Sequence, residues 1–325
     1  MKRSYHLALP VAVALALIAA AVLLYVVRQR EVRPLRTQFP AMGTICAISV
    51  YGGEAELHAA FVAGKAEFDR VEAACSLFRP DSELSRLNAA AGQEDFLCSE
   101  AMWHLIARAE RAYRESGGEF DITVKPLMDL WGFYRKRGDR SPTAEEIRAT
   151  LARVGFDKLI LDGRRRSIRF KVPGMALDLG GIAKGYAADL AAAAIVRSGI
   201  TAGVVDLGGN LRFLPRPPPG RSCYRVAIRD PRNPGGTLPE LLEIRPGRAV
   251  STSGDYERFV VLDGKRRGHI ISPKTGIPGG GPAVSVVADT ALDADVLSTS
   301  CVLGGPPVAE KLRKLYPGIQ MVFAP

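Results

Sequence analysis

The feature that most restricts how this chain can fold is a charge-free run close to its start. Residues 7–27 carry no charged side chain. As a helix rising ~1.5 Å per residue, such a run reaches roughly 32 Å, enough to cross a hydrocarbon layer of about 30 Å. A buried core helix is the alternative, but flanking basic residues and the terminal position are typical of a targeting segment. We therefore divide the chain into an N-terminal membrane anchor or signal with its linker, residues 1–35, and a folded body, residues 36–325.

This segment leaves two questions open. Its apolar run is longer than the ~7–15 residues of an ordinary signal core, so a retained anchor is favoured over a cleaved signal. Lipoprotein processing is not expected, because the first cysteine, Cys46, lies well beyond the run. Two basic residues precede the run and four follow it closely, so the positive-inside rule would leave the body in the cytoplasm. The short basic start resembles an export signal instead, so these patterns alone do not fix the orientation.

The net charge of +10 is unevenly distributed along the chain. Residues 1–36 hold six basic side chains and one acidic one, so they carry half of the net positive charge of the chain. The remaining basic residues are scattered and form no stripe interleaved with aromatic residues, which argues against a nucleic-acid-binding surface. A moderately basic body suits an anionic ligand.

The cysteines give no sign of a metal site. There are five, an odd number, and no pair has CxxC or metal-knuckle spacing. We expect most of them to be small buried apolar residues, with one disulfide in an exported protein as the alternative.

Strands and helices alternate irregularly in the body, which predicts an α+β fold rather than a regular doubly wound sheet. Apolar spacing and cap signals predict helices at residues 54–74, 99–115, 141–155, 183–197 and 291–303. Strands are predicted at residues 45–51, 158–161, 167–171, 204–206 and 224–228. Residues 214–239 are rich in Pro, Gly and Arg, which indicates a surface excursion around one strand.

Asp295 and Thr299 are the first candidate ligands for a metal. They lie four residues apart in a predicted helix and so share one face. Mg²⁺ prefers a few protein oxygens together with water and phosphate. Taken alone, such a pair is more often a solvated helix face. Asp289 and Asp293 make the segment acidic, however, and crowded carboxylates favour a cation.

A glycine-rich turn at Gly180 and Gly181 precedes the Ala-rich helix. Backbone N–H groups at such a helix start attract phosphate. The turn matches neither the P-loop, since no Ser or Thr follows Lys184, nor the GxGxxG pattern. Tight packing between strand and helix is the alternative. Together with Asp295 and Thr299, the turn indicates metal-assisted chemistry on a phosphate-bearing cofactor.

His269 is the third candidate, and on its own it is ambiguous. It precedes two apolar β-branched residues, and a histidine at such a strand end is often structural. No Ser-His-Asp arrangement for acyl transfer stands out in the sequence. The polar segments 76–84, 120–123 and 251–256 fit ordinary loops as well as ligand-contacting ones.

Taken in order, these segments resemble one family, the ApbE family of FAD:protein FMN transferases. Single motifs are weak, but nine of them in family order are highly specific. They are AMGT (41–44), SLFRPDSELSRLN (76–88), GEFDITVKPLMDLWGF (118–133), DLGGIAKGYAAD (178–189), DLGGN (206–210), YRVAIRDPRNP (224–234), STSGDYER (251–258), HIISPKTG (269–276) and ADVLSTSCVLG (294–304).

The resemblance implies an α+β, T-fold-like flavin-transferase body that binds FAD as a substrate and Mg²⁺ as a cofactor. It implies that the side chains of Asp295 and Thr299 and the backbone carbonyl of Gly181 bind the metal. It further implies a protein anchored in the inner (cytoplasmic) membrane with its catalytic domain facing the periplasm. The implied FAD-binding positions are Met42, Phe78, Glu119, Phe120, Asp121, Asp178, Lys184, Ser253, Gly254 and Ile270.

The reaction implied by the resemblance is phosphoryl transfer. A Thr or Ser hydroxyl of an acceptor flavoprotein, such as a subunit of a respiratory or other redox complex, attacks the FMN-side phosphorus of FAD, and AMP leaves. This explains why the chain offers no convincing nucleophile of its own. Mg²⁺ and Lys184 would offset the charge of the diphosphate, and His269 would take the hydroxyl proton.

The chain departs from the family at three positions. An acidic residue is common where Ser272 stands, and Pro and Gly are common in place of Ile122 and Lys125. These changes put full activity in doubt more than FAD binding. The alternatives are therefore an FAD pyrophosphatase, in which water replaces the acceptor hydroxyl, a non-catalytic periplasmic FAD-binding protein, and a membrane-tethered scaffold.

Overall fold

The computed structural model describes residue 17 and residues 33–92, 94–135, 138–233, 235–255 and 258–324. The predicted anchor at residues 7–27 lies outside these residues except for Leu17, so it stays a prediction. Among the described residues, no helix has both the length and the apolar character that crossing a membrane requires. The described part is almost entirely the predicted body.

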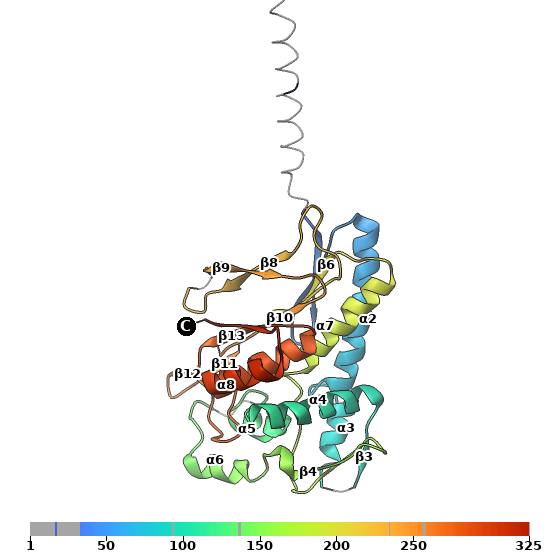
Figure 1. Ribbon diagram of the computed structural model, residues 1–325. Helices are drawn as coiled ribbons and strands as arrows, with labels where there is room; N and C mark the ends of the chain where they lie inside the picture. Colours follow the sequence, from blue (N-terminus) through green and yellow to red (C-terminus); the bar gives the residue numbers. More distant parts are fainter. Residues whose placement is uncertain are drawn as a thin grey trace, which may run out of the picture.

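A seven-stranded sheet forms the centre of the body (Figure 1), and every neighbouring pair in it is antiparallel. Strand β13 is buried at every position because both faces of the sheet are covered there. Strand β1 lies at the edge and is only partly buried. In sheet order the strands are β1 (Leu35–Ala41), β2 (Thr44–Val50), β6 (Gly203–Leu207), β7 (Asn210–Phe213), β10 (Ala249–Ser253), β13 (Ala283–Ala288) and β14 (Gln320–Ala324).

Three long helices pack on the sheet: α2 (Glu54–Cys75), α7 (Ala183–Arg197) and α8 (Ala291–Leu315) (Figure 1). Helix α7 contacts both of the others, because its buried positions are mostly Ala and Gly and allow close approach. A separate hairpin, β8 (Tyr224–Arg229) with β9 (Thr237–Ile244), packs Tyr224 and Ile244 against side chains of β7, β10 and β13.

Helix α4 (Glu100–Ser116) and several short elements form the end of the body opposite the β8–β9 hairpin (Figure 1). Helix α4 begins at Ser99, whose side chain accepts a hydrogen bond from the backbone of Met102, and it ends at Gly117 in the left-handed conformation. The other elements there are α3 (Glu83–Ala89), β3 (Phe96–Leu97), η1 (Ile122–Val124), α5 (Lys125–Leu130), α6 (Ala144–Leu151), η2 (Phe156–Lys158), β4 (Leu159–Asp162) and β5 (Ser167–Phe170).

Helix α8 consists of two segments joined at Gly305, which has φ 59° and ψ −157°. Pro306 and Pro307 follow and begin the second segment, where missing N–H groups cost nothing. The predicted helix at residues 291–303 is the first segment. Another hairpin, β11 (Phe259–Leu262) with β12 (Lys265–Gly268), forms a two-stranded sheet of its own.

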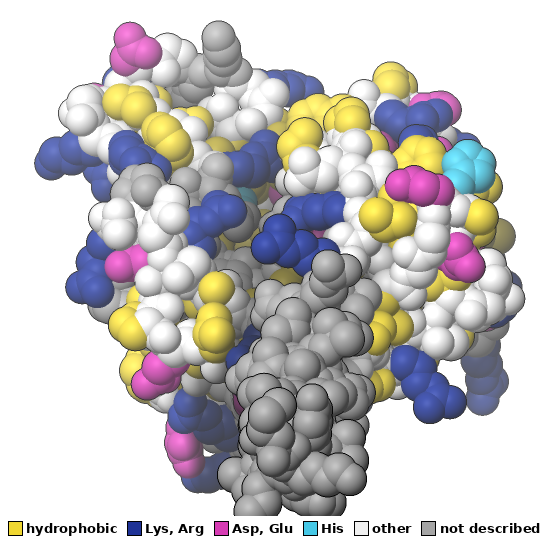
Figure 2. All heavy atoms as spheres, turned by 90° about the horizontal axis from the view of Figure 1, so that it is seen from above, with side chains coloured by type: hydrophobic (Ala, Val, Ile, Leu, Met, Phe, Trp, Pro, Cys, Tyr) yellow, Lys and Arg dark blue, Asp and Glu magenta, His cyan; other side chains and the backbone are white. Residues whose placement is uncertain are grey.

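The fold confirms the predicted α+β class and most predicted elements. One difference is residues 214–239, where the excursion contains the start of a second strand, β9, paired with β8. The sequence signals of Pro and Gly there mark the turn between two strands. All five cysteines are free, and Cys46, Cys98 and Cys301 are buried, so the disulfide alternative is wrong. Lys and Arg side chains lie dispersed among apolar and acidic ones on the face in Figure 2.

Candidate active site

One cavity of about 540 Å³ is lined by segments from most of the body. This volume lies within the ~300–1,000 Å³ range of small-molecule sites. The cavity is bordered by the β1–β2 turn, the loop after α2, the start of α7, the end of β10 and the first segment of α8. Every residue that the sequence predicts for catalysis, FAD or metal lines it: Met42, Phe78, Glu119, Phe120, Asp121, Asp178, Gly181, Lys184, Ser253, Gly254, His269, Ile270, Asp295 and Thr299.

The two predicted metal ligands of α8 face the glycine turn. A Cβ placed on Gly181 would lie 3.5 Å from Thr299 Oγ1, so the turn and the helix nearly touch. Asp295 is buried, and its Oδ2 accepts a hydrogen bond of 2.9 Å from the backbone N–H of Gly185. Burial raises the pKa of Asp295, whereas the charge of Lys184 and the Gly185 N–H lower it. The structure therefore brings Asp295 and Thr299 next to the glycine-rich turn, although more than a hundred residues separate them in the sequence.

The carbonyl of Gly181 lies before the first acceptor of α7, because the first hydrogen bond of that helix runs from the N–H of Tyr186 to the carbonyl of Ile182. The N–H of Gly185 is one of the donors that have no acceptor within a helix start, and it donates to Asp295. Among the described residues, no donor reaches the Gly181 carbonyl. Gly181, Asp295 and Thr299 line the same cavity, and together they offer a carbonyl, a carboxylate and a hydroxyl, an all-oxygen set that suits Mg²⁺. No group of three or more His, Cys, Asp or Glu side chains in the described ranges could hold a metal.

A buried hydroxyl network fixes Thr299 from behind. Ser253 Oγ lies 3.1 Å from Thr299 Oγ1 and 2.8 Å from Ser298 Oγ, and Ser298 Oγ donates to Ser251 Oγ. When the Asn210 amide is oriented to satisfy its neighbours, its nitrogen donates to Ser251 Oγ and Asp295 Oδ1, and its oxygen accepts from Lys184 Nζ. Because these buried polar groups have hydrogen-bond partners, the network holds its side chains in one geometry.

Asp178 shapes the turn rather than standing free. Its Oδ1 accepts a hydrogen bond of 2.8 Å from Gly180 N, and its Oδ2 accepts one of 2.6 Å from the hydroxyl of Tyr134. Burial, and then the charge of Asp178, raise the pKa of Tyr134 far above its usual value, so the phenol stays protonated and donates. Phe78 stacks edge-on against Tyr134 with ring centroids 5.6 Å apart, although Phe78 itself is 69% exposed. An exposed aromatic ring at a cavity offers a surface for another planar ring.

The predicted acidic stretch has mostly internal roles. Both carboxylate oxygens of Asp121 are occupied, one by the N–H and hydroxyl of Thr123 and the other by the N–H of Phe156. Burial raises the pKa of Asp121 in spite of these bonds. Glu119 pairs with Lys274 at 2.7 Å. Asp121 therefore orders the cavity wall, and Phe120 and Ile270 supply buried apolar surface.

Met42 occupies a strained backbone position at the cavity. It has φ 50° and is followed by Gly43 with φ 71°, in the two-residue turn that joins β1 to β2. Such hairpin turns require positive φ at both central residues, and a non-glycine residue there is strained. The N–H of Met42 donates to Glu72 Oε2 at 3.1 Å, which helps to hold the turn.

His269 is half-buried, and its ring has one nitrogen available. Its Nδ1 lies 3.3 Å from the carbonyl oxygen of Arg258. Since a carbonyl only accepts, Nδ1 carries the proton and Nε2 is the free base. Burial above all, and then the charges of Arg258 and Lys184, lower the pKa of His269 to about 4. The imidazole is therefore neutral at neutral pH and able to accept a proton.

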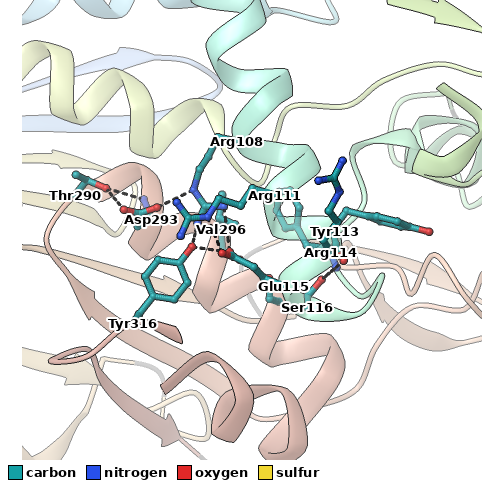
Figure 3. A network of polar contacts seen from close by, with 12 residues as sticks. Arg108, Arg111, Tyr113, Arg114, Glu115, Ser116, Thr290, Asp293, Val296 and Tyr316 are labelled. Atoms are coloured by element: carbon teal, nitrogen blue, oxygen red, sulfur yellow. Dashed lines mark hydrogen bonds and ion pairs between the residues drawn. The ribbon is translucent and has the colours of Figure 1, made fainter. Parts of the chain in front are cut away.

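A polar network outside the cavity braces α8 against α4 (Figure 3). Arg108 Nε donates to Asp293 Oδ1 at 2.8 Å, and its Nη2 donates to the hydroxyl of Tyr316 at 3.1 Å. The Tyr316 hydroxyl in turn donates to Glu115 Oε2 at 2.5 Å. Asp293 is in the first turn of α8 and Tyr316 follows its last residue, so one arginine ties both ends of the kinked helix. This fixes the helix that carries Asp295 and Thr299.

Sequence reasoning missed several residues of the site. Tyr134 lies one residue beyond a recognised motif, and nothing in its pattern marked it. Asn210, Ser251 and Ser298 lie inside recognised motifs and could have been proposed as polar supports. Ser272 does not line the cavity; its Oγ accepts from the N–H groups of two residues in its own turn. The family's acidic side chain would therefore replace a turn-forming hydroxyl here.

The family model described as "ApbE family" matches residues 42–323. The chain belongs to the ApbE family. A relative from Klebsiella pneumoniae (strain 342), named FAD:protein FMN transferase, is 35% identical over 277 residues, covering 83% of this chain and 79% of the relative. A relative of the same name from Escherichia coli (strain K12) is 32% identical and covers 83% of this chain and 78% of its own length. The name of these relatives is that of a transferase enzyme.

Solved structures of the family have the same fold. The crystal structure of the ApbE protein from Thermotoga maritima superposes with a TM-score of 0.80 at 30% identity, covering 90% of this chain and 94% of that one. The flavin transferase ApbE from Vibrio cholerae gives a TM-score of 0.78 at 30% identity, covering 89% and 93%. The ApbE-like α+β body predicted from the motifs is thus confirmed.

Proposed function

We propose that this protein transfers the FMN moiety of FAD to a Thr or Ser hydroxyl of an acceptor protein and releases AMP. The observation that carries the proposal is the convergence of Asp295, Thr299, the open Gly181 carbonyl, Lys184 and His269 on one cavity, in a member of the ApbE family. A carrier that only stored FAD would not need this set of oxygen donors beside a base.

The oxygen set is the site we assign to Mg²⁺. Asp295 and Thr299 would bind it through their side chains, and Gly181 through its carbonyl, while Ser253 and Asn210 hold the two side chains in place. The bound ion would supply positive charge beside the diphosphate, which phosphoryl transfer depends on. Lys184 adds a second positive charge on the same wall.

His269 is the group that we assign to the incoming hydroxyl. The hydroxyl oxygen forms a bond to the FMN-side phosphorus, and the bond from that phosphorus to the bridging oxygen breaks, so AMP leaves with that oxygen. The hydroxyl proton passes to Nε2 of His269. With a pKa of about 4, His269 is a weak base in the free protein, and the negative charge of a bound diphosphate favours its protonation.

We propose that the acceptor supplies the nucleophile, because the cavity hydroxyls of Ser253 and Thr299 are hydrogen-bonded to each other and Ser253 also to Ser298. We propose an acceptor that is a subunit of a respiratory or other redox complex. We also propose that the N-terminal segment holds the protein in the inner membrane with its catalytic body in the periplasm.

The test uses the purified protein, FAD, Mg²⁺ and a membrane extract from a strain that lacks this gene. We expect a fluorescent protein band in a denaturing gel, because the flavin is bound covalently, with AMP formed in equal amount. No such band should form after chelation of Mg²⁺. Free FMN and AMP without a band would assign hydrolysis. Unchanged bound FAD would assign a carrier, and no flavin binding would assign a scaffold; each of these results contradicts the proposal.

A further inference from the structure

The β11–β12 hairpin carries exposed apolar and basic side chains that the chemistry in the cavity does not use. Its inner face packs Val260 and Leu262 into an apolar cluster with Trp131 of the neighbouring loop. Its outer face leaves Phe259 45% exposed and Val261 53% exposed. Two large apolar side chains lie side by side on a two-stranded sheet that pairs with no other described strand, so they are candidates for a docking surface.

One basic side chain, Arg266, lies on the same face as these two apolar side chains, whereas Lys265 and Arg267 pair in register with the inner-face residues Leu262 and Val260. Arg266 lies opposite Val261 in the hairpin register, and its guanidinium stacks 3.8 Å from the ring centroid of Phe259. Neither Arg266 nor Lys265 forms an ion pair with a carboxylate among the described residues. A guanidinium stacked on a ring keeps its planar N–H groups available for a carboxylate.

The hairpin as a whole is strongly basic. Residues 258–268 contain four basic side chains and one acidic one, Asp263. The carboxylate of Asp263 already accepts a hydrogen bond from the N–H of Ser141. The surface therefore suits a partner that is acidic and offers some apolar contact.

Both ends of the hairpin join the wall of the cavity. Arg258 and His269 line the cavity, and the N–H of His269 donates to the Arg258 carbonyl at 3.1 Å. Arg258 also lies over the ring of Tyr134, 6.0 Å from its centroid. A chain lying across the outer face would thus end beside the residue that we assign to the acceptor hydroxyl.

We propose that the outer face of the β11–β12 hairpin, made of Phe259, Val261 and Arg266, binds an acidic segment of the acceptor protein adjoining the Thr or Ser that receives FMN. The proposal rests on the proposed function, since it names the partner of that site. It assigns recognition to charge and apolar contact on the hairpin, and chemistry to the cavity.

The test measures binding of two fluorescein-labelled 12-residue peptides to the full chain loaded with FAD and Mg²⁺. Both peptides have a central Thr and two Leu; one carries four Asp and the other four Lys. We expect the Asp peptide to bind at least 10-fold more tightly, with affinity falling as salt rises. Arg266→Glu should abolish or reverse this preference, and Val261→Asp should weaken binding of the Asp peptide at least 5-fold.

Arg164→Glu is the matched control, because Arg164 is exposed on the β4–β5 turn and is remote from the hairpin in sequence. It should leave the preference unchanged, and all variants should keep the thermal midpoint of the parent. Equal binding of the two peptides, or an Arg266→Glu variant that keeps the preference, would overturn the proposal. So would a dimer that Arg266→Glu dissociates, because the face would then be covered by a second copy of the chain.

The same samples separate the two claims. Covalent flavin on the peptides, read by mass spectrometry, reports the proposed function. Flavin transfer with no peptide preference would contradict the hairpin assignment alone. A clear preference for the Asp peptide in a protein that transfers flavin to no acceptor would sustain the surface as a binding site and remove the proposed function.

Discussion

At the scale of single residues, the cavity separates groups that hold the site from groups that face into it. Asp121 and Asp178 have both carboxylate oxygens occupied by neighbouring donors. His269 instead presents a ring nitrogen that its backbone contact leaves free. Residue type alone does not distinguish these roles, so the strongest tests at this scale concern His269.

Replacing His269 by Asn should lower flavin transfer by about 10²–10³-fold, because positioned proton acceptors typically contribute at this level. The dissociation constant for FAD should change by less than about 3-fold. Transfer is measured as the initial rate of covalent band formation at saturating FAD, and FAD binding by calorimetry. Full activity in this variant would show that the proton leaves by another route.

The lowered pKa of His269 also predicts a pH dependence of stability. Since the pKa is about 4 in the folded chain and 6.5 in the reference state, the unfolded state binds the proton first as the pH falls. The contribution of neutral His269 is full above about pH 6.5 and is lost progressively down to pH 4. Between pH 7.5 and 5, the parent should lose about 1–2 kcal/mol more unfolding free energy than His269→Gln, measured with urea. Parallel losses in both proteins would contradict the pKa.

At the scale of elements, the site depends on how closely α7 and α8 approach. A Cβ on Gly185 of α7 would lie 2.3 Å from the carbonyl oxygen of Ala291 at the start of α8. No rotamer can relieve that contact, because the backbone fixes the position of a Cβ and the oxygen belongs to the backbone of Ala291. The missing side chain at Gly185 therefore lets the two helices pack closely. The hydrogen bond from the Gly185 N–H to the Asp295 carboxylate links them.

Gly185→Ala should destabilise the chain by about 1–3 kcal/mol, the usual cost of overpacking, and should weaken Mg²⁺-dependent transfer by displacing Asp295. Gly280→Ala is the control, since a Cβ there meets nothing within 4 Å. Thermal unfolding and the Mg²⁺ concentration for half-maximal transfer are the measurements. Equal behaviour of both variants would refute the close contact.

The brace between α4 and α8 gives a second test at this scale. The side chain of Arg108 is 9% exposed and bonds to Asp293 and Tyr316, whereas that of Arg111 is 61% exposed and pairs with Glu115. Arg108→Ala should cost about 1–3 kcal/mol because it removes hydrogen bonds of a charged group to the partly buried Asp293 carboxylate and to the Tyr316 hydroxyl, and Arg111→Ala should cost less than about 1 kcal/mol. Urea unfolding of the two variants would expose a wrong assignment if their losses were alike.

At the scale of the whole molecule, the folded body and the N-terminal segment can be tested separately. A chain that begins at Arg33 should keep the thermal midpoint and the FAD affinity of the full chain, because the described fold uses residues from 33 onward. The full chain should sediment with membranes, and the shortened chain should not. Sedimentation of both forms, or of neither, would refute a membrane anchor in residues 1–32.

Much of this molecule follows from local sequence signals. Ser99 and Gly117 delimit α4 as expected, and the Ala-rich run gives α7 its bounds, because caps and periodicity are local properties. The Asp295–Thr299 pair was predictable for the same reason. Tyr134, Asn210 and the link from Arg108 to Tyr316 were not, because they depend on contacts between segments far apart in the chain.

The hydrogen bond from Gly185 to Asp295 has a further consequence. Gly185 is the third residue of α7, so its buried N–H has no acceptor within the helix and depends on Asp295. Asp295→Ala would therefore remove a carboxylate from the cavity and also leave that N–H without its partner. One side chain thus serves both as a proposed ligand and as the cap of the helix that follows the glycine turn.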